Sequence, residues 1–234
     1  MLSTVDAAIL CGGQGTRLRS LDLGVPKSMA PIHGRPFLEL LVRDLARQGA
    51  GRIVLCTGYG REAIRAHFSG GDWGVPLAFS EETAPLGTAG ALRQALDQLR
   101  GDPILAMNGD SYTPFDLEAL QARERATQAE AIVVVAPASE RRDAGVIALD
   151  AAGWVRDFAE KSARPDAAFH SAGIYLLRRR VLEGLPPGAA ASLEFDVLPR
   201  LVPGRVAAVA AEGEIVDIGT PERLARAQEL LAGL

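Results

Sequence analysis

Short apolar runs alternate with amphipathic stretches along most of this chain. The runs are rich in aliphatic and β-branched residues, and turn-forming residues bound most of them, which is the pattern of a buried strand. We therefore predict strands over residues 7–11, 52–58, 75–79, 103–107, 131–136, 171–177, 206–211 and 214–219.

Apolar residues at helical spacing fill several of the intervals between these runs. Leucines spaced by three and four residues share one face of a helix predicted over residues 37–48, which Gly49 ends. Thr220 and Pro221 are typical of the N-cap and first position of a last helix. Further helices are predicted over residues 62–68, 91–99 and 117–128, and a short one opens at Ser192.

The order of these elements predicts the fold class. Strands and helices alternate in the first half, which favours a parallel sheet, whereas residues 145–155 predict a β-hairpin with its turn at 150–153. The sequence contains no internal repeat or separating linker, so residues 1–234 are expected to form one domain. We predict an α/β fold: a single Rossmann-like three-layer α/β/α domain with a mixed, mostly parallel central sheet.

The composition limits the kinds of partner and compartment that we expect for this protein. The net charge is −4 and no long basic run is present, which argues against nucleic acid as a partner. The sequence shows no leader pattern and no apolar stretch of membrane-spanning length, so we expect a cytoplasmic protein with no membrane partner. Cys11 and Cys56 are too few for a disulfide framework or a zinc site and are predicted to pack in the core.

A glycine-containing loop follows the first predicted strand. Glycines at 12, 13 and 15 would leave backbone N–H groups open on a concave loop, and Arg17 and Lys27 add cations that a polyphosphate would need. Two common phosphate loops are excluded. Leu18 stands where a dinucleotide-binding loop has its third glycine, and Pro26 precedes Lys27 where a Walker A loop has glycine.

Five ordered motifs resemble those of the sugar-1-phosphate nucleotidyltransferases, and the resemblance covers essentially the whole chain. They are residues 12–18 with Pro26-Lys27, Pro31-Ile32 and Gly34-Arg35-Pro36; residues 85–91; Asn108-Gly109-Asp110; Glu160-Lys161; and residues 217–221. The resemblance implies transfer of a nucleotidyl group from an NTP to a sugar 1-phosphate, with pyrophosphate released. It also implies that residues 1–140 bind the nucleotide and residues 141–234 the sugar phosphate.

The resemblance also implies roles for individual residues. Arg17 and Lys27 would be catalytic cations, and Asp110 and Asp217 would hold Mg²⁺, a hard cation that takes carboxylate oxygens. Taken alone, Asp110 could cap the next segment and Asp217 could be a structural acid. The implied nucleotide-binding residues are Leu10, Gly12, Gly13, Gly15, Thr16, Arg17, Leu86, Gly87, Asn108 and Gly109; the implied sugar-phosphate-binding residues are Gly145, Glu160, Lys161 and Ser171.

The preferred substrates follow from resemblance alone. Many relatives have Asn where this chain has Ser171, which lacks the paired donor and acceptor of an amide, so the sugar contact there differs. The motifs look most like those of D-glycero-α-D-manno-heptose 1-phosphate guanylyltransferases, which favours GTP, a manno-heptose 1-phosphate and a role in surface-glycan or related glycoside synthesis. Uridylyl or thymidylyl transfer to N-acetylmuramate, glucose or mannose 1-phosphate stays open as an alternative activity. A non-catalytic protein that binds nucleotide sugars stays open as an alternative function, and a homo-oligomer stays open as the assembly.

Overall fold

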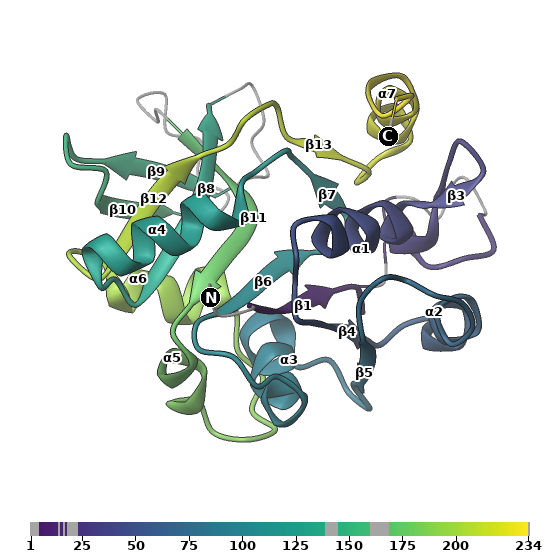
Figure 1. Cartoon of the computed structure of the whole chain (residues 1–234), viewed down its shortest axis with the longest axis horizontal. Coiled ribbons are helices and arrows are strands. Elements are labelled where there is room, and N and C mark those ends of the chain that lie inside the picture. Colours follow the sequence, from purple (N-terminus) through teal and green to yellow (C-terminus); the bar gives the residue numbers. More distant parts are fainter. Residues whose placement is uncertain are drawn as a thin grey trace.

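The computed structural model describes residues 5–13, 15, 17, 23–138, 145–159 and 169–233. Within these residues, nine strands form one twisted sheet, with β10, β9, β11, β6, β1, β4 and β5 in spatial order and with β8 and β12 attached beside β11 (Figure 1). Helices cover both faces of this sheet, so the predicted mixed α/β/α architecture is confirmed.

The first half of the chain forms the parallel part of the sheet. Strand β1 (Asp6–Leu10) lies between β4 (Arg52–Thr57) and β6 (Ile104–Asn108), and both neighbours run parallel to it. Strand β5 (Leu77–Glu81) pairs parallel with β4 at the edge. The carboxyl ends of these strands therefore share one edge of the sheet, where ligands of such folds usually bind.

The second half adds an antiparallel part around β11 (Phe169–Leu177), which pairs with β6 and with β8 (Ala131–Pro137). Strands β9 (Val146–Leu149) and β10 (Val155–Ala159) form an antiparallel hairpin, which confirms the predicted turn between them. The remaining strand, β12 (Val206–Ala210), runs parallel to β8.

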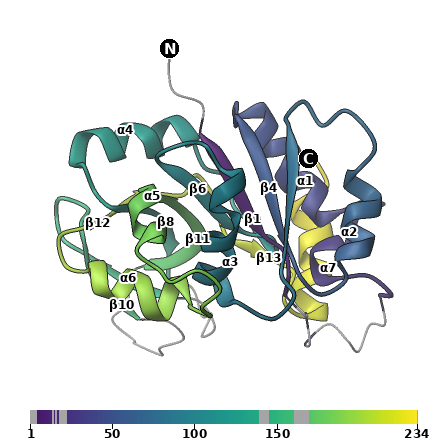
Figure 2. The ribbon, with the colours of Figure 1, turned by 90° about the horizontal axis from the view of Figure 1, so that it is seen from below.

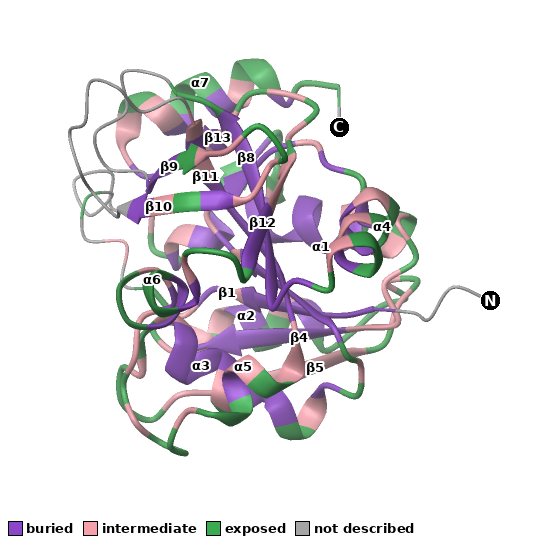
Figure 3. Cartoon of the chain, turned by 90° about the vertical axis from the view of Figure 1, so that its left-hand side faces the viewer, coloured by how far each residue is buried: buried purple, intermediate pink, exposed green. Residues whose placement is uncertain are grey.

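Successive residues of the central strands point to opposite faces, as a strand requires. Ile9 packs in one core cluster and Ala8 in the other. Figure 3 shows the central strands buried and the outer helix surfaces exposed, and Figure 2 shows helices flanking the sheet. The first cluster packs against α1 (Phe37–Arg47), α2 (Arg61–Phe68), α4 (Leu117–Thr127) and α7 (Pro221–Leu230); the second packs against α3 (Gly87–Ala95), α5 (Arg179–Glu183) and α6 (Leu198–Leu201).

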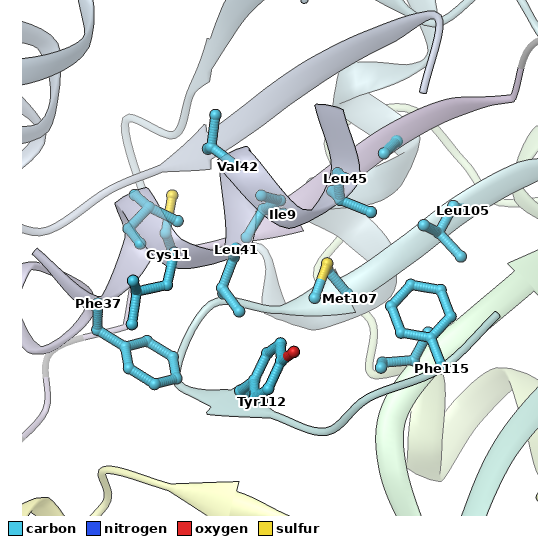
Figure 4. Packing of buried hydrophobic residues seen from close by; sticks show 14 of the residues in the cluster. Ile9, Cys11, Phe37, Leu41, Val42, Leu45, Leu105, Met107, Tyr112 and Phe115 are labelled. Carbon is cyan, nitrogen blue, oxygen red and sulfur yellow. The ribbon is translucent and has the colours of Figure 1, made fainter. Parts of the chain in front are cut away.

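Helix α1 fills the first face as its leucine spacing predicts. Leu41 and Leu45 lie beside Ile9 and Met107 in the close view of this cluster (Figure 4). Both leucines are fully buried. None of the helices in the described part of the chain is long and apolar enough to cross a membrane.

The structure corrects two predicted elements and adds one. The helix expected at 91–99 begins at Gly87 as α3 and ends as a 3-10 turn, η3 (Leu96–Gln98). The strand expected at 214–219 is reduced to β13 (Val216–Asp217), which pairs antiparallel with the two-residue strand β7 (Ser111–Tyr112). The connector before α1 contains a small hairpin of β2 (Pro31–Ile32) and β3 (Arg35–Pro36), preceded by the 3-10 turn η2 (Lys27–Met29).

Two predicted helix starts are confirmed by their hydrogen bonds. The hydroxyl of Thr220 accepts from the N–H of Arg223 at 3.3 Å, and Pro221 occupies the first position of α7. The hydroxyl of Ser192 accepts from the N–H of Phe195 at 3.1 Å and opens η4 (Leu193–Val197), a π-helical turn that leads into α6.

Candidate active site

Two pockets meet at the carboxyl end of β6. Asn108, its last residue, and Asp110, two positions later, line both of them. We call them the charged pocket, of about 130 Å³, and the wide pocket, of about 720 Å³. A molecule in one pocket would therefore contact a molecule in the other across these two residues.

The wide pocket lies over the carboxyl ends of β1, β4 and β6. Five of the implied nucleotide-binding residues line it: Leu10, Gly12, Gly13, Gly87 and Asn108. Cys56 also lines it, and burial raises the pKa of its thiol to about 12, so it is no thiolate nucleophile at neutral pH. The lining residues that sequence reasoning missed are Gly58, Tyr59, Arg61, Glu62, Glu82, Thr83 and Ala84. Pro85, Thr88 and Ala91 also line it; they belong to the 85–91 motif but had no individual role assigned.

Glu82 is a half-buried acid among these missed residues. Its Oε2 accepts a hydrogen bond from the N–H of Leu86 at 2.9 Å, which ties together the loop between β5 and α3. Burial raises the pKa of its carboxyl, and the Leu86 N–H opposes that rise. In the sequence, a glutamate shortly before a turn looks the same whether it contacts a ligand or lies on the surface.

Three of the implied nucleotide-binding residues do not line the wide pocket but contact other parts of the protein: Gly15, Leu86 and Gly109. Gly15 packs against the Lys27 side chain: a Cβ added at Gly15 would lie 2.7 Å from the Cβ of Lys27. The N–H of Gly109 donates to the carbonyl of Leu10 at 2.9 Å and joins β6 to β1. The carbonyl of Leu86 accepts from Ala191, and its N–H is held by Glu82. Thr16 lies outside the described residues.

The charged pocket brings together the implied catalytic and metal-binding residues. Arg17, Lys27, Asp110 and Asp217 all line it. Lys27 Nζ lies 2.6 Å from Asp110 Oδ2, and the lysine side chain is 11% exposed. The N–H of Ile218 donates to the carbonyl of Asp110 at 3.1 Å, so the two distant acidic motifs are held side by side.

The pairing of β7 with β13 explains how Asp217 reaches this site. Asp217 stands opposite Ser111, the residue after Asp110, in the antiparallel register. Its Oδ1 accepts from the N–H of Gly219 at 2.7 Å. Arg223 Nη1 lies 3.2 Å from its Oδ2. The carboxylate is thus almost buried yet well compensated, as a buried charge must be.

The other end of the charged pocket is lined by neutral polar groups. Gly145 and Ser171, both implied sugar-phosphate contacts, lie on its wall with Tyr175. The hydroxyls of Ser171 and Tyr175 are 3.0 Å apart, and the N–H of Gly173 donates to the Ser171 hydroxyl at 3.2 Å. Glu160 and Lys161 lie outside the described residues.

A strap formed by residues 189–194 crosses the N-terminal turn of α3. The carbonyl of Ala191 accepts from the N–H groups of Ala89 and Gly90, at 2.9 and 3.2 Å. A Cβ at Gly87 would lie 2.6 Å from that carbonyl, and one at Gly90 would lie 2.6 Å from the carbonyl of Ala189. The glycines of the 85–91 motif therefore make room for the strap.

The strap also connects the two pockets. The hydroxyl of Thr88, in the wide pocket, donates to Glu194 Oε2 in the charged pocket at 2.7 Å. The same hydroxyl accepts from the N–H of Leu193 at 2.7 Å. The hydroxyl of Ser192 donates to the same Glu194 oxygen at 3.0 Å, so two hydroxyls hold an acid that sequence reasoning did not select as a site residue.

The acidic groups of the charged pocket suit a hard divalent cation. Asp110 and Asp217 offer carboxylate oxygens, the ligands that such a cation prefers. No cluster of three or more Asp, Glu, His or Cys side chains suited to a metal occurs in the described ranges. The pair therefore fits an ion that takes its remaining ligands from phosphate oxygens and water.

This chain is similar in sequence and in fold to known proteins. A family model described as nucleotidyl transferase matches residues 6–233. The mannose-1-phosphate guanylyltransferase of Mycobacterium tuberculosis is 32% identical, over 98% of this chain and 66% of its own length. The chain thus spans slightly less than two thirds of that relative.

Two further similar proteins match this chain over nearly their full length. The D-glycero-alpha-D-manno-heptose 1-phosphate guanylyltransferase of Aneurinibacillus thermoaerophilus is 31% identical, over 97% of this chain and 98% of its own length. The crystal structure of HddC from Yersinia pseudotuberculosis complexed with GMP-PN superposes with a TM-score of 0.82, at 29% identity, and covers 97% of this chain and 100% of that one.

Proposed function

Because this chain belongs to the nucleotidyl transferase family, we propose that it joins GTP to a sugar 1-phosphate and releases pyrophosphate. The sugar that we favour is D-glycero-α-D-manno-heptose 1-phosphate. The product would be the corresponding GDP-sugar, an activated donor for surface-glycan or related glycoside synthesis.

The observation that carries this proposal is the meeting of the two pockets at Asn108 and Asp110. Nucleotidyl transfer needs two bound substrates whose phosphates touch. The wide pocket is large enough for a nucleoside, and the charged pocket has the cations Arg17 and Lys27 at the junction. The nucleotide would lie in the wide pocket and the sugar phosphate in the charged one.

In the proposed reaction an oxygen of the sugar phosphate attacks the α-phosphate of GTP. One P–O bond forms, the bond from the α-phosphorus to the bridging oxygen breaks, and pyrophosphate leaves with that bond's electron pair. The attacking oxygen is already anionic, so no side chain needs to remove a proton. The barrier comes largely from bringing anions together, and Lys27 and Arg17 would lower it by neutralising phosphate charge.

We assign the metal role to Asp110 and Asp217, with Mg²⁺ as the ion. Bound between these carboxylates and the phosphates, Mg²⁺ would neutralise the charge that develops on the departing pyrophosphate. Lys27 holds Asp110 at 2.6 Å in the structure, so phosphate binding would give this lysine an alternative anionic partner. Glu160 and Lys161 are proposed to contact the sugar hydroxyls and the sugar phosphate.

Glu82 supports guanine as the base. An ionised carboxylate offers two adjacent acceptors, and the N1–H and N2–H groups of guanine are two adjacent donors. Adenine and cytosine place an acceptor beside their amino donor, and uracil has one donor between two carbonyls. A half-buried carboxylate in the wide pocket therefore pairs best with guanine.

The relatives support the heptose phosphate, because the heptose 1-phosphate guanylyltransferases match this chain over nearly their full length. Mannose 1-phosphate is the second candidate sugar, favoured by the mycobacterial relative. The Ser171–Tyr175 hydroxyl pair lies on the wall where the choice between them would be made.

A pyrophosphate-release assay tests the proposal. GTP, UTP, dTTP, CTP and ATP would each be offered with heptose, mannose, glucose and N-acetylmuramate 1-phosphates in the presence of Mg²⁺. We expect release with GTP and the heptose phosphate above every other pair. Release with no pair would contradict the proposal and favour a non-catalytic nucleotide-sugar-binding protein.

A further inference from the structure

Arg223 occupies a position where a cation is unfavourable. It is the third residue of α7, and the N-terminal turn of a helix carries partial positive charge that favours acids. When Thr is the N-cap, as Thr220 is here, Glu or Gln at the third position completes a capping box. The chain has Arg instead, so the local preference of the helix is overridden.

The contacts of Arg223 show what overrides it. Its Nη1 lies 3.2 Å from Asp217 Oδ2 and 3.3 Å from Asp217 Oδ1. The carboxylate side chain is 10% exposed, and its Oδ1 also accepts from the N–H of Gly219. The guanidinium thus contacts both oxygens of the acid that we assign to the metal, and together with Gly219 it fixes the carboxylate orientation.

A second arginine on the same helix provides a contrast. Arg226, one turn later, pairs with Glu214 at 2.8 Å, and both side chains are more than half exposed. Exposed pairs of this kind contribute little to stability. Arg226 is therefore a matched control for Arg223: the same residue type on the same helix, paired with Glu214 rather than with Asp217.

We propose that Arg223 is a positioning residue for Asp217 that also limits binding of a divalent cation to the free enzyme. It holds the carboxylate toward the charged pocket, and its positive charge competes with the cation for the same oxygens. The negative charge of nucleotide phosphates offsets this repulsion, so the cation binds well only together with the nucleotide. This inference rests on the proposed role of Asp217 as a metal ligand.

Titration of the free enzyme with Mn²⁺ alone, followed by electron paramagnetic resonance, tests the inference. Arg223→Gln and Arg223→Ala should bind Mn²⁺ about tenfold more tightly than wild type, because a full positive charge beside the ligand is removed. Their kcat at saturating Mg²⁺ should fall at least about tenfold, because Asp217 loses its anchor. Arg226→Ala should change neither quantity by more than about twofold.

The opposite changes in Mn²⁺ affinity and kcat distinguish this role from a structural one. A counter-charge that only keeps Asp217 folded in place would, when removed, weaken Mn²⁺ binding and kcat together, and that result would overturn the inference. Arg223→Lys retains the charge and should bind Mn²⁺ within about twofold of wild type. A tenfold gain of affinity in that variant would also overturn it.

Asp217→Asn separates this inference from the proposed function. If Asp217→Asn binds Mn²⁺ as wild type does, Asp217 is no metal ligand, and both the metal assignment and the role of Arg223 fail. If Asp217→Asn loses Mn²⁺ binding while the Arg223 variants also bind more weakly than wild type, the metal assignment stands and only the role of Arg223 fails.

Discussion

Replacement of Glu82 by glutamine should reduce the preference for GTP. The N–H of Leu86 donates to Glu82 Oε2 at 2.9 Å and requires an acceptor there. In Glu82→Gln the amide oxygen would stay on this N–H, and the amide NH₂ would face the base. A hydrogen-bond donor of guanine would then face a hydrogen-bond donor of the protein.

The expected loss follows from this geometry. One charge-assisted hydrogen bond, worth ~1.5–3 kcal/mol, disappears, and a half-buried donor is left unpaired beneath the base at a further cost of ~1 kcal/mol. A total near 3 kcal/mol corresponds to a decrease of roughly 100-fold in kcat/KM for GTP. Uracil should gain, because its N3–H and a neighbouring carbonyl match the acceptor and donor of an amide.

The assay is pyrophosphate release with GTP and UTP at a fixed sugar 1-phosphate concentration. Glu81→Gln is the control, because Glu81 pairs with Arg65 and does not line the wide pocket. Burial raises the pKa of Glu82, so the wild-type preference for GTP should also decline as the pH falls through that raised pKa, where the protonated carboxyl resembles the amide. A GTP-to-UTP ratio for Glu82→Gln within threefold of wild type would refute the reasoning.

Two further predictions concern the strap. Thr88→Val removes the hydroxyl that forms hydrogen bonds with Glu194 and Leu193, so the KM for the sugar 1-phosphate should rise about tenfold while the KM for GTP changes less. Thr88→Ser is the control, and equal KM values for Thr88→Val and wild type would contradict the coupling. Gly90→Ala places a Cβ 2.6 Å from the carbonyl of Ala189 and should lower the free energy of unfolding by about 2 kcal/mol, which calorimetry would record as a fall of roughly 4–8 °C in Tm. Gly70→Ala is the control: no atom lies within 4 Å of its new Cβ, so Tm should stay nearly unchanged. An equally small effect at Gly90 would argue against the crowding.

The sequence predicted the sheet better than it predicted the site. Buried parallel strands such as β6 leave long apolar runs that are readable without neighbours. Strands β7 and β13 have two residues each, too few to show an alternating pattern, and their pairing is a tertiary contact. The position of Asp217 beside Asp110 was therefore expected from resemblance and was found only in the fold.

The functional residues that the sequence analysis did not select were overlooked for a different reason. Glu82 stands in the loop after β5, where polar residues are ordinary. Thr88 and Gly90 belong to the 85–91 motif, but the contacts that explain them are visible only once the strap crosses α3. Arg223 did leave a local signal, because it breaks the capping preference of its helix. Such a break indicates a constraint from elsewhere in the fold.

The most direct test of the account is the dependence of pyrophosphate release on the sugar 1-phosphate and on Asp110. Wild-type enzyme with GTP and Mg²⁺ should release one pyrophosphate for each GDP-sugar formed, and almost none when the sugar phosphate is omitted. Asp110→Asn should lower this rate at least about 1000-fold, because it removes a proposed metal ligand and the negatively charged partner of Lys27 at the junction of the pockets. A near-wild-type rate for Asp110→Asn, or release independent of the sugar phosphate, would contradict the two-pocket transfer mechanism.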